Sequence, residues 1–169
     1  MTEADDIEDG ARRVVVGLDD SVGARTALRH GLAEARRRGA ELEVVTSFVS
    51  PERLAVLDRI PVTADRASAA RAATAAARAV VDEVLAAERA EHPDRPVPRV
   101  VVRAVAGDPG PALTDAAADA ELLVLGHRGR GGVATTLLGS TGWWCVRHAR
   151  CPLTIVPGAP AVPPAPPLP

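Results

Sequence analysis

Five short runs rich in valine and leucine limit the folds open to this chain more than any other feature. They lie at residues 12–20, 40–49, 99–107, 121–126 and 152–157. Most are apolar at consecutive positions rather than at alternate ones, which is typical of strands buried on both faces. Such strands belong mainly to parallel sheets that carry helices on both sides.

The longer segments between these runs predict helices. Residues 21–39 begin at Ser21, a residue type that favours helix N-caps, and end at Gly39, which favours helix C-termini. Within this segment three apolar residues share one helical face: Leu28, Leu32 and Ala35. Residues 64–90 are rich in alanine, the residue with the highest intrinsic helix propensity.

Two shorter helices complete the pattern. Residues 111–121 predict a helix with one apolar face: Leu113, Ala116, Ala117 and Ala120. Residues 140–149 predict a last helix, capped by Ser140. Its inward face is expected to carry small or apolar residues: Gly142, Cys145, Val146 and Ala149. Cys145 is therefore expected to be a small core residue and not a nucleophile.

Two adjacent tryptophans on the last helix, Trp143 and Trp144, leave two readings open. They flank the expected inward face, so Trp143 should be substantially exposed. Either both rings fold down onto the preceding loop, or they form a contact surface for a partner.

Strands and helices thus alternate from the first run to the last. Because crossovers between parallel strands are right-handed, the order predicts a single doubly wound (Rossmann-like) five-stranded parallel sheet sandwiched by helices, an α/β fold. The 169 residues suit one domain at residues 11–157. Residues 1–10 are expected to form an acidic tail, and residues 158–169 a proline-rich tail.

Composition excludes several classes of function. All 20 basic residues are arginine, so no mechanism can use a lysine. A net charge of −2 gives no basic field for nucleic acid or an anionic membrane. No apolar run approaches the length of a membrane span, and the acidic start does not resemble a signal peptide. We therefore expect a cytoplasmic protein whose two cysteines are reduced.

Three loops are expected to meet at the carboxyl edge of the sheet, where ligands bind in folds of this type. Their sequences are "GLDDS" at residues 17–21, "AGDPG" at residues 106–110 and "GHRGRGGVATTLLGS" at residues 126–140. The third contains no carboxylate and precedes a predicted helix. Glycine-rich backbone beside a helix N-terminus favours a bound phosphate, because it presents free N–H groups to an anion.

Two familiar phosphate-binding motifs do not fit this third loop. A Walker-type loop requires a lysine, and the chain has none. The spacing of Gly129, Gly131 and Ala134 matches a dinucleotide fingerprint, but it does not follow the first strand. No acidic residue follows it to hold a ribose either.

A third pattern fits in full: Gly126-x2-Gly129-x9-Gly139-Ser140. With a strand before it and a helix after it, this pattern resembles the ATP-binding branch of the universal stress protein family. "VVVGLDDS", "ELLVLGHRGRGG" and "LLGSTGWWCVRHARCPLTIVP" resemble the family's first strand, fourth strand and closing elements. The resemblance covers residues 12–157.

This resemblance implies a set of ATP-binding residues. Asp19 would lie near the ribose or phosphates, with a magnesium ion as one option, Ser47 near the adenine and Gly107 near the ribose. The remaining residues would approach the phosphates: Gly126, His127, Arg128, Gly129, Gly139, Ser140 and Thr141. Family members commonly pair through the last strand, so the resemblance also implies a homodimer through residues 153–156.

Three functions remain open from the sequence. The first is an ATP-binding regulatory or stress-response protein that acts on an unknown protein partner, with slow ATP hydrolysis at most. The second is a nucleotide-free homodimeric interaction protein. The third is an ATP-activating hydrolase or ligase of the same superfamily. The third is disfavoured because residues 17–23 read "GLDDSVG" and lack the paired glycines of those enzymes.

Overall fold

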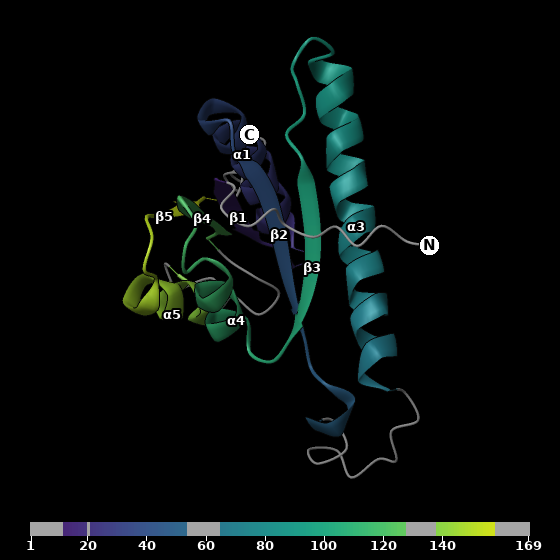
Figure 1. Cartoon of the computed structure of the whole chain (residues 1–169), viewed down its shortest axis with the longest axis vertical. Helices are drawn as coiled ribbons and strands as arrows, with labels where there is room; N and C mark the ends of the chain where they lie inside the picture. Colours follow the sequence, from purple (N-terminus) through teal and green to yellow (C-terminus); the bar gives the residue numbers. More distant parts are fainter. Residues whose placement is uncertain (1–11, 20, 54–64, 128–137, 158–169) are drawn as a thin grey trace, which may run out of the picture.

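A computed structural model describes residues 12–19, 21–53, 65–127 and 138–157 of the chain. Nine helices and strands are defined within these ranges: β1 (Arg13–Gly17), α1 (Val22–Arg38), β2 (Glu41–Phe48), α3 (Arg66–Glu91), β3 (Val100–Ala106), α4 (Pro109–Ala116), β4 (Leu122–Gly126), α5 (Ser140–His148) and β5 (Leu153–Val156). Figure 1 shows them as one sheet with helices packed against it.

The five strands form one parallel sheet in the order β3-β2-β1-β4-β5. β1 is the central strand, with β2 on one side and β4 on the other. Because β1 and β4 are neighbours while β2 and β3 lie beyond β1, the strand order reverses at the β1–β4 pair. The predicted doubly wound, five-stranded parallel sheet is confirmed.

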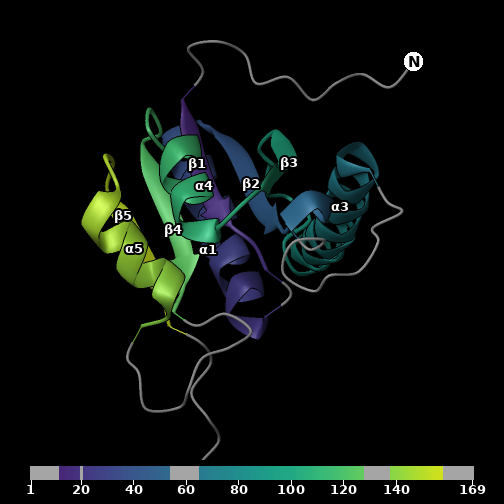
Figure 2. The same cartoon turned by 90° about the horizontal axis from the view of Figure 1, so that it is seen from below.

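Two helices cover each face of the sheet (Figure 2). α1 and α3 enclose one core, whose members include Val14, Val16, Leu28 and Leu32. α4 and α5 enclose the other, with Val15, Leu123 and Cys145 among its members. Val14, Val15 and Val16 have no exposed surface, because consecutive residues of the central strand point into opposite layers that are both filled.

α1 and α3 begin and end with recognisable signals. The side chain of Ser21 accepts a hydrogen bond from the N–H of Ala24 at the start of α1. Gly39 ends that helix in the left-handed conformation, with φ of 61°. Asp65 caps α3 by accepting from the N–H of Ser68. The predicted caps of the first helix, Ser21 and Gly39, are therefore confirmed.

One carboxylate is buried among the strands. Glu43 of β2 is 1% exposed and lies between Arg13 of β1, at 3.0 Å, and Arg103 of β3, at 2.7 Å. Arg13 donates a hydrogen bond to it, whereas the Arg103 contact is an ion pair without a well-directed hydrogen bond. Two guanidinium groups offset the desolvation of this carboxylate and link the three strands.

Two expectations about the shorter helices need correction. α4 spans Pro109–Ala116 and not residues 111–121, because residues 117–119 form a turn that ends the helix early. Its predicted apolar face is nevertheless buried throughout: Leu113, Ala116, Ala117 and Ala120. On α5 the expected inward position of Val146 is wrong. Val146 is 52% exposed, because α5 turns the Gly142 and Cys145 side of the helix toward the core.

The tryptophans on α5 are both partly open to solvent. Trp143 is 58% exposed, as expected, and Trp144 is 41% exposed. No helix within the described ranges combines the length and apolar character needed to cross a bilayer.

The packing of α1 on β1 supplies a test of the fold. An alanine Cβ at Gly31 would lie 2.3 Å from Cγ2 of Val16, a stiff side chain in the central strand. We expect Gly31→Ala to lower the free energy of unfolding by about 1–3 kcal/mol through overpacking. In an exposed helix the same change would stabilise by about 1 kcal/mol. Urea denaturation followed by circular dichroism measures the difference.

The double variant Gly31→Ala/Val16→Ala is the control for this contact. Removing the Val16 methyl groups frees the space that the new Cβ needs. The penalty of Gly31→Ala should therefore be smaller in the Val16→Ala background than in the wild-type chain. Equal penalties in both backgrounds would contradict the close packing of α1 on β1.

Candidate functional site

Residues predicted to bind ligand lie at the carboxyl edge of the sheet. Asp19 follows β1, and His127 follows the neighbouring β4. Ser47 is the penultimate residue of β2, and Gly107 follows β3, where its N–H donates to the carbonyl of Phe48 at 2.9 Å. α5 ends near the amino edge of the sheet, where β5 begins. Its first residues therefore lie near the carboxyl edge. This brings Gly139, Ser140 and Thr141 to the same side.

The N-terminus of α1 already carries an anionic group. Oδ1 of Asp19 accepts the N–H of Ser21 at 3.0 Å and also the Ser21 hydroxyl. The Ser21 oxygen in turn accepts the N–H of Ala24 at 3.1 Å. A phosphate placed directly at this helix end would meet the Asp19 carboxylate, which opposes binding unless a cation lies between them.

The N-terminus of α4 offers little to an anion. Its first three residues are Pro109, Gly110 and Pro111, and the first helical hydrogen bond runs from Ala112 to Asp108. Prolines have no N–H, so Gly110 carries the one donor in this turn. The Asp108 side chain does not cap the helix but pairs with Arg53 at 3.2 Å, which ties the segment after β2 to the segment after β3.

The N-terminus of α5 differs from both. The prediction that Ser140 caps this helix is wrong: the N-cap is Gly139, whose backbone is extended, and Ser140 is already the first helical residue. Gly139 has no side chain, so it makes no side-chain hydrogen bond to cap the helix. The first helical bond runs from the N–H of Trp143 to the carbonyl of Gly139 at 3.0 Å. The N–H groups of Ser140, Thr141 and Gly142 therefore have no helical partner and point along the positive end of the helix dipole.

The glycines predicted to bind the nucleotide differ in why the fold needs a glycine at each position. A Cβ at Gly126 would lie 2.7 Å from the carbonyl carbon of Gly23, so β4 could not pass α1 with a larger residue. Gly107 has φ of 126°, which L-residues rarely adopt. Gly139 has an ordinary φ of −70°, and a Cβ there would meet no atom of the described residues within 4 Å. Within the described part of the chain, neither packing nor a positive φ requires a glycine at position 139, where it serves as the N-cap of α5.

Other predicted residues are only partly placed. Arg128 and Gly129 lie outside the described residues. The N–H of His127 donates to the carbonyl of Val156 at 2.8 Å, and its side chain is half-buried. Among the described residues, no three His, Cys, Asp or Glu side chains are grouped to hold a metal ion.

Cys145 belongs to α5, and Cys151 lies between α5 and β5. The surroundings of both disfavour a reactive thiolate. Both are free thiols, and Cys145 has no exposed surface. Burial raises the pKa of the Cys145 thiol to about 11, and the nearby Cys151 adds to the shift. Burial also raises the pKa of Cys151. Few thiolates therefore form at neutral pH. Because Cys145 is fully buried in the core beneath α4 and α5, the prediction that it is a core residue is confirmed.

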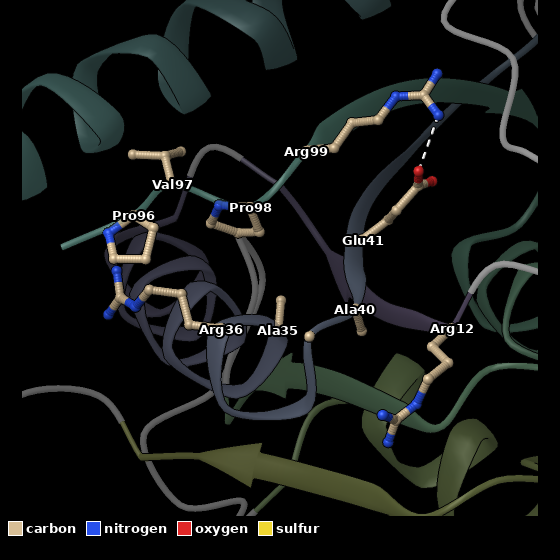
Figure 3. Close-up of a pocket in the computed structure, with 10 residues that line it drawn as sticks. Arg12, Ala35, Arg36, Ala40, Glu41, Pro96, Val97, Pro98 and Arg99 are labelled. Carbon is tan, nitrogen blue, oxygen red and sulfur yellow. Dashed lines mark hydrogen bonds and ion pairs between the residues drawn. The ribbon is translucent and has the colours of Figure 1, made fainter.

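A hollow of about 510 Å³ lies at the opposite, amino edge of the sheet (Figure 3). No sequence pattern predicts this hollow, because its walls come from three separate segments: Arg12, residues 35–41 and residues 96–99. Each of its arginines has a carboxylate partner. Arg12 pairs with Glu121, Arg36 with Glu88 at 3.5 Å, and Arg99 with Glu41 at 2.8 Å. These pairings leave the hollow without an evident anion-binding group.

These observations define the class of the protein. It is a doubly wound parallel α/β domain with three loops at one edge and an uncapped helix N-terminus among them. The family model described as the universal stress protein family matches residues 10–157, and the chain belongs to that family.

Curated relatives agree with this assignment. A universal stress protein of Mycobacterium tuberculosis is 34% identical over 144 residues, covering 84% of this chain and 44% of the relative. One from Mycolicibacterium smegmatis is 31% identical over 143 residues, covering 85% and 45%. The chain thus spans less than half the length of these relatives.

Solved structures share the fold. The universal stress protein UspA from Lactobacillus plantarum superposes with a TM-score of 0.60 at 20% identity, covering 86% of this chain and 97% of that one. A universal stress protein from Archaeoglobus fulgidus, solved in complex with dAMP, gives 0.58 at 21% identity, with coverage of 86% and 97%. One solved in complex with cAMP gives 0.58 at 23%, with coverage of 88% and 98%.

The different reasons for Gly126 and Gly139 can be tested without any ligand. Gly126→Ala should lower the midpoint of thermal unfolding by several degrees, because the new methyl group meets the backbone of α1. Gly139→Ala should lower the midpoint less, because no described atom lies within 4 Å of the added methyl group and the loss is limited to replacing a favourable N-cap residue. Differential scanning calorimetry of the wild type and the two variants measures the three unfolding midpoints. A larger loss for Gly139→Ala would contradict the described geometry.

Proposed function

We propose that this chain is an ATP-binding regulatory protein that holds the nucleotide at the carboxyl edge of its sheet. One observation supports the proposal above all: among the described residues, no side chain caps the N-terminus of α5 and none packs where a Cβ of Gly139 would lie. An anion could therefore approach Gly139 closely, and the N–H groups of Ser140, Thr141 and Gly142, which have no helical partner, could donate to phosphate oxygens. Solved relatives in complex with cAMP and dAMP support an adenine nucleotide as the ligand.

The remaining residues fit this arrangement by position. Ser47, the penultimate residue of β2, would lie near the adenine, and Gly107 would bring the backbone after β3 near the ribose. The phosphates would extend toward Ser140 and Thr141, past Gly126 and His127, with Arg128 and Gly129 in the connecting loop. Asp19 stands beside them, where a magnesium ion bound to the phosphates would offset its negative charge.

Binding, and not catalysis, is the proposed activity. The chain contains no lysine to assist phosphoryl transfer, and Asp19, the carboxylate placed beside the phosphates, already accepts hydrogen bonds from Ser21. Any ATP hydrolysis should therefore be slow. We propose that nucleotide occupancy changes a surface read by a protein partner in the cytoplasm during stress, with residues 11–157 as the binding domain and tails on either side.

Mass spectrometry of ligand released from freshly purified protein tests this proposal. We expect ATP, or its hydrolysis products, from the wild-type chain. Gly139→Val should abolish retention because the valine side chain fills the space above the N–H groups of α5. Its unfolding midpoint should remain near that of the wild type.

Two results would contradict the nucleotide site. Equal retention of ATP by the Gly139→Val variant would place the nucleotide elsewhere. A wild-type protein that releases no nucleotide and binds none in calorimetry would favour a nucleotide-free interaction protein. Release of AMP and pyrophosphate in the presence of an acceptor would instead favour an ATP-activating enzyme.

We also propose that the chain forms a homodimer through β5. This strand is the last in the sheet order, and it pairs with β4 on one side. The carbonyls of Pro152 and Val156 accept hydrogen bonds from β4. In a parallel ladder the alternate residues, Leu153 and Ile155, then turn their N–H and C=O groups to the open side. Such an edge can pair with a second copy.

Ile155→Pro tests the dimer. Proline removes an N–H that faces the open side while the β4 pairing of Thr154 and Val156 remains. We expect the wild type to elute as a dimer and this variant as a monomer in size-exclusion chromatography with light scattering. Circular dichroism checks that the variant is folded. A folded variant that stays dimeric would rule out pairing through this edge.

A further inference from the structure

Trp144 lies between two helices that begin at the proposed nucleotide site. A Cβ built at Gly110 of α4 would lie 2.5 Å from Cγ, 2.7 Å from Cδ1 and 2.8 Å from Cβ of Trp144. The tryptophan therefore packs directly on the bare backbone of the first turn of α4. Its other neighbour is His148, whose ring stacks on it with centroids 4.1 Å apart and planes inclined by 17°.

α5 depends on α4 for its position. Its contacts with α4 are more extensive than those with β5, the one strand with which it shares a substantial contact among the described elements. Cys145 is the fully buried side chain of this helix, and it enters the same core as Leu113 and Ala116 of α4. Trp144 adds the contact nearest to the start of α4. The position of α5 over the sheet thus follows that of α4.

The contact between Trp144 and Gly110 also lies close to the N-termini of α4 and α5, which face the proposed nucleotide site. Gly110 is in the first turn of α4, two residues after Asp108 and three after Gly107. Trp144 is in the second turn of α5, just after Ser140 and Thr141, whose N–H groups have no helical partner. Any movement of α5 relative to α4 would change the distance between the backbone of Gly107 and those N–H groups.

We infer that Trp144 is a positioning residue for the nucleotide: packed on Gly110, it fixes the spacing between the Gly107 backbone and the N-terminus of α5. The inference rests on the proposed function and adds to it a constraint on ligand length. A nucleotide reaches from the ribose side to the phosphate side and needs the correct spacing. Inorganic triphosphate would bind on the phosphate side alone, at the N-terminus of α5 and beside Gly126 and His127, and does not need the Gly107 side.

This difference provides the experiment. Isothermal titration calorimetry measures the Kd of ATP and of inorganic triphosphate for the wild type and for Trp144→Ala. We expect ATP to bind about tenfold more weakly to the variant, while triphosphate binds equally to both. Trp144→Phe, which keeps an aromatic ring on Gly110, should restore most of the ATP affinity.

Trp143→Ala is the matched control. Trp143 is the neighbouring tryptophan on the same helix, and it is 58% exposed. Trp143→Ala removes an identical side chain from the same helix. The three atoms nearest to a Cβ at Gly110 all belong to Trp144 and not to Trp143. ATP affinity should stay within about twofold of the wild type.

A double-mutant cycle tests the contact itself. Gly110→Ala should weaken ATP binding in the wild-type chain because the added methyl group meets the Trp144 ring. In the Trp144→Ala background the same change should cost less, since the ring is absent.

Three outcomes would overturn the inference. The first is unchanged ATP affinity in Trp144→Ala. The second is an equal loss for ATP and triphosphate, which would mean that the variant only disrupts α5. The third is additive effects of Gly110→Ala and Trp144→Ala. A wild type that binds triphosphate but not ATP would instead overturn the proposed function, and the inference with it.

Discussion

The parallel pairing of β1 with β4 is the contact on which the rest of the molecule depends. It places the reversal of strand order at the centre of the sheet, so the helices that follow β1 and β4 lie on opposite faces. In folds of this type, a reversal of strand order opens a crevice at the carboxyl ends of the two strands, where ligands bind. The pairing requires β4 to end against the first turn of α1, which is close enough that Gly126 faces the backbone of Gly23.

This close approach changes how the glycine pattern is understood. A spacing motif treats its glycines as equivalent, but their surroundings differ. Gly126 is needed by the packing of β4 on α1, and Gly107 by its backbone conformation. Among the described residues neither reason applies to Gly139, and under the proposed function the bound phosphate is what favours a glycine there. Some residues of a motif are required by the fold and others by the ligand. A motif residue that the fold does not require therefore says most about function.

The sequence was sufficient for the sheet and its two-sided cover, because apolar periodicity follows directly from burial. It correctly placed Leu28, Leu32 and Cys145 in the core. It failed for Val146, since a helix of only nine residues has too few apolar residues to define its inward direction. It also gave no indication of the Glu43 ion pairs or of the hollow beside Arg36, because both depend on which distant strands become neighbours. Of the candidate site, the sequence predicted the edge and the glycines but not the difference between the three helix N-termini.

That difference follows from local chemistry once the fold is known. α1 begins beside a carboxylate, α4 begins with two prolines around one glycine, and α5 begins uncapped. An anion therefore has one favourable helix end and two unfavourable ones along this edge. α5 is also the helix least anchored to the sheet, and it packs chiefly on α4. The helix with the strongest attraction for phosphate thus owes its position to a neighbour that lines the other side of the site. In such an arrangement the packing between α4 and α5 contributes to ligand affinity without touching the ligand.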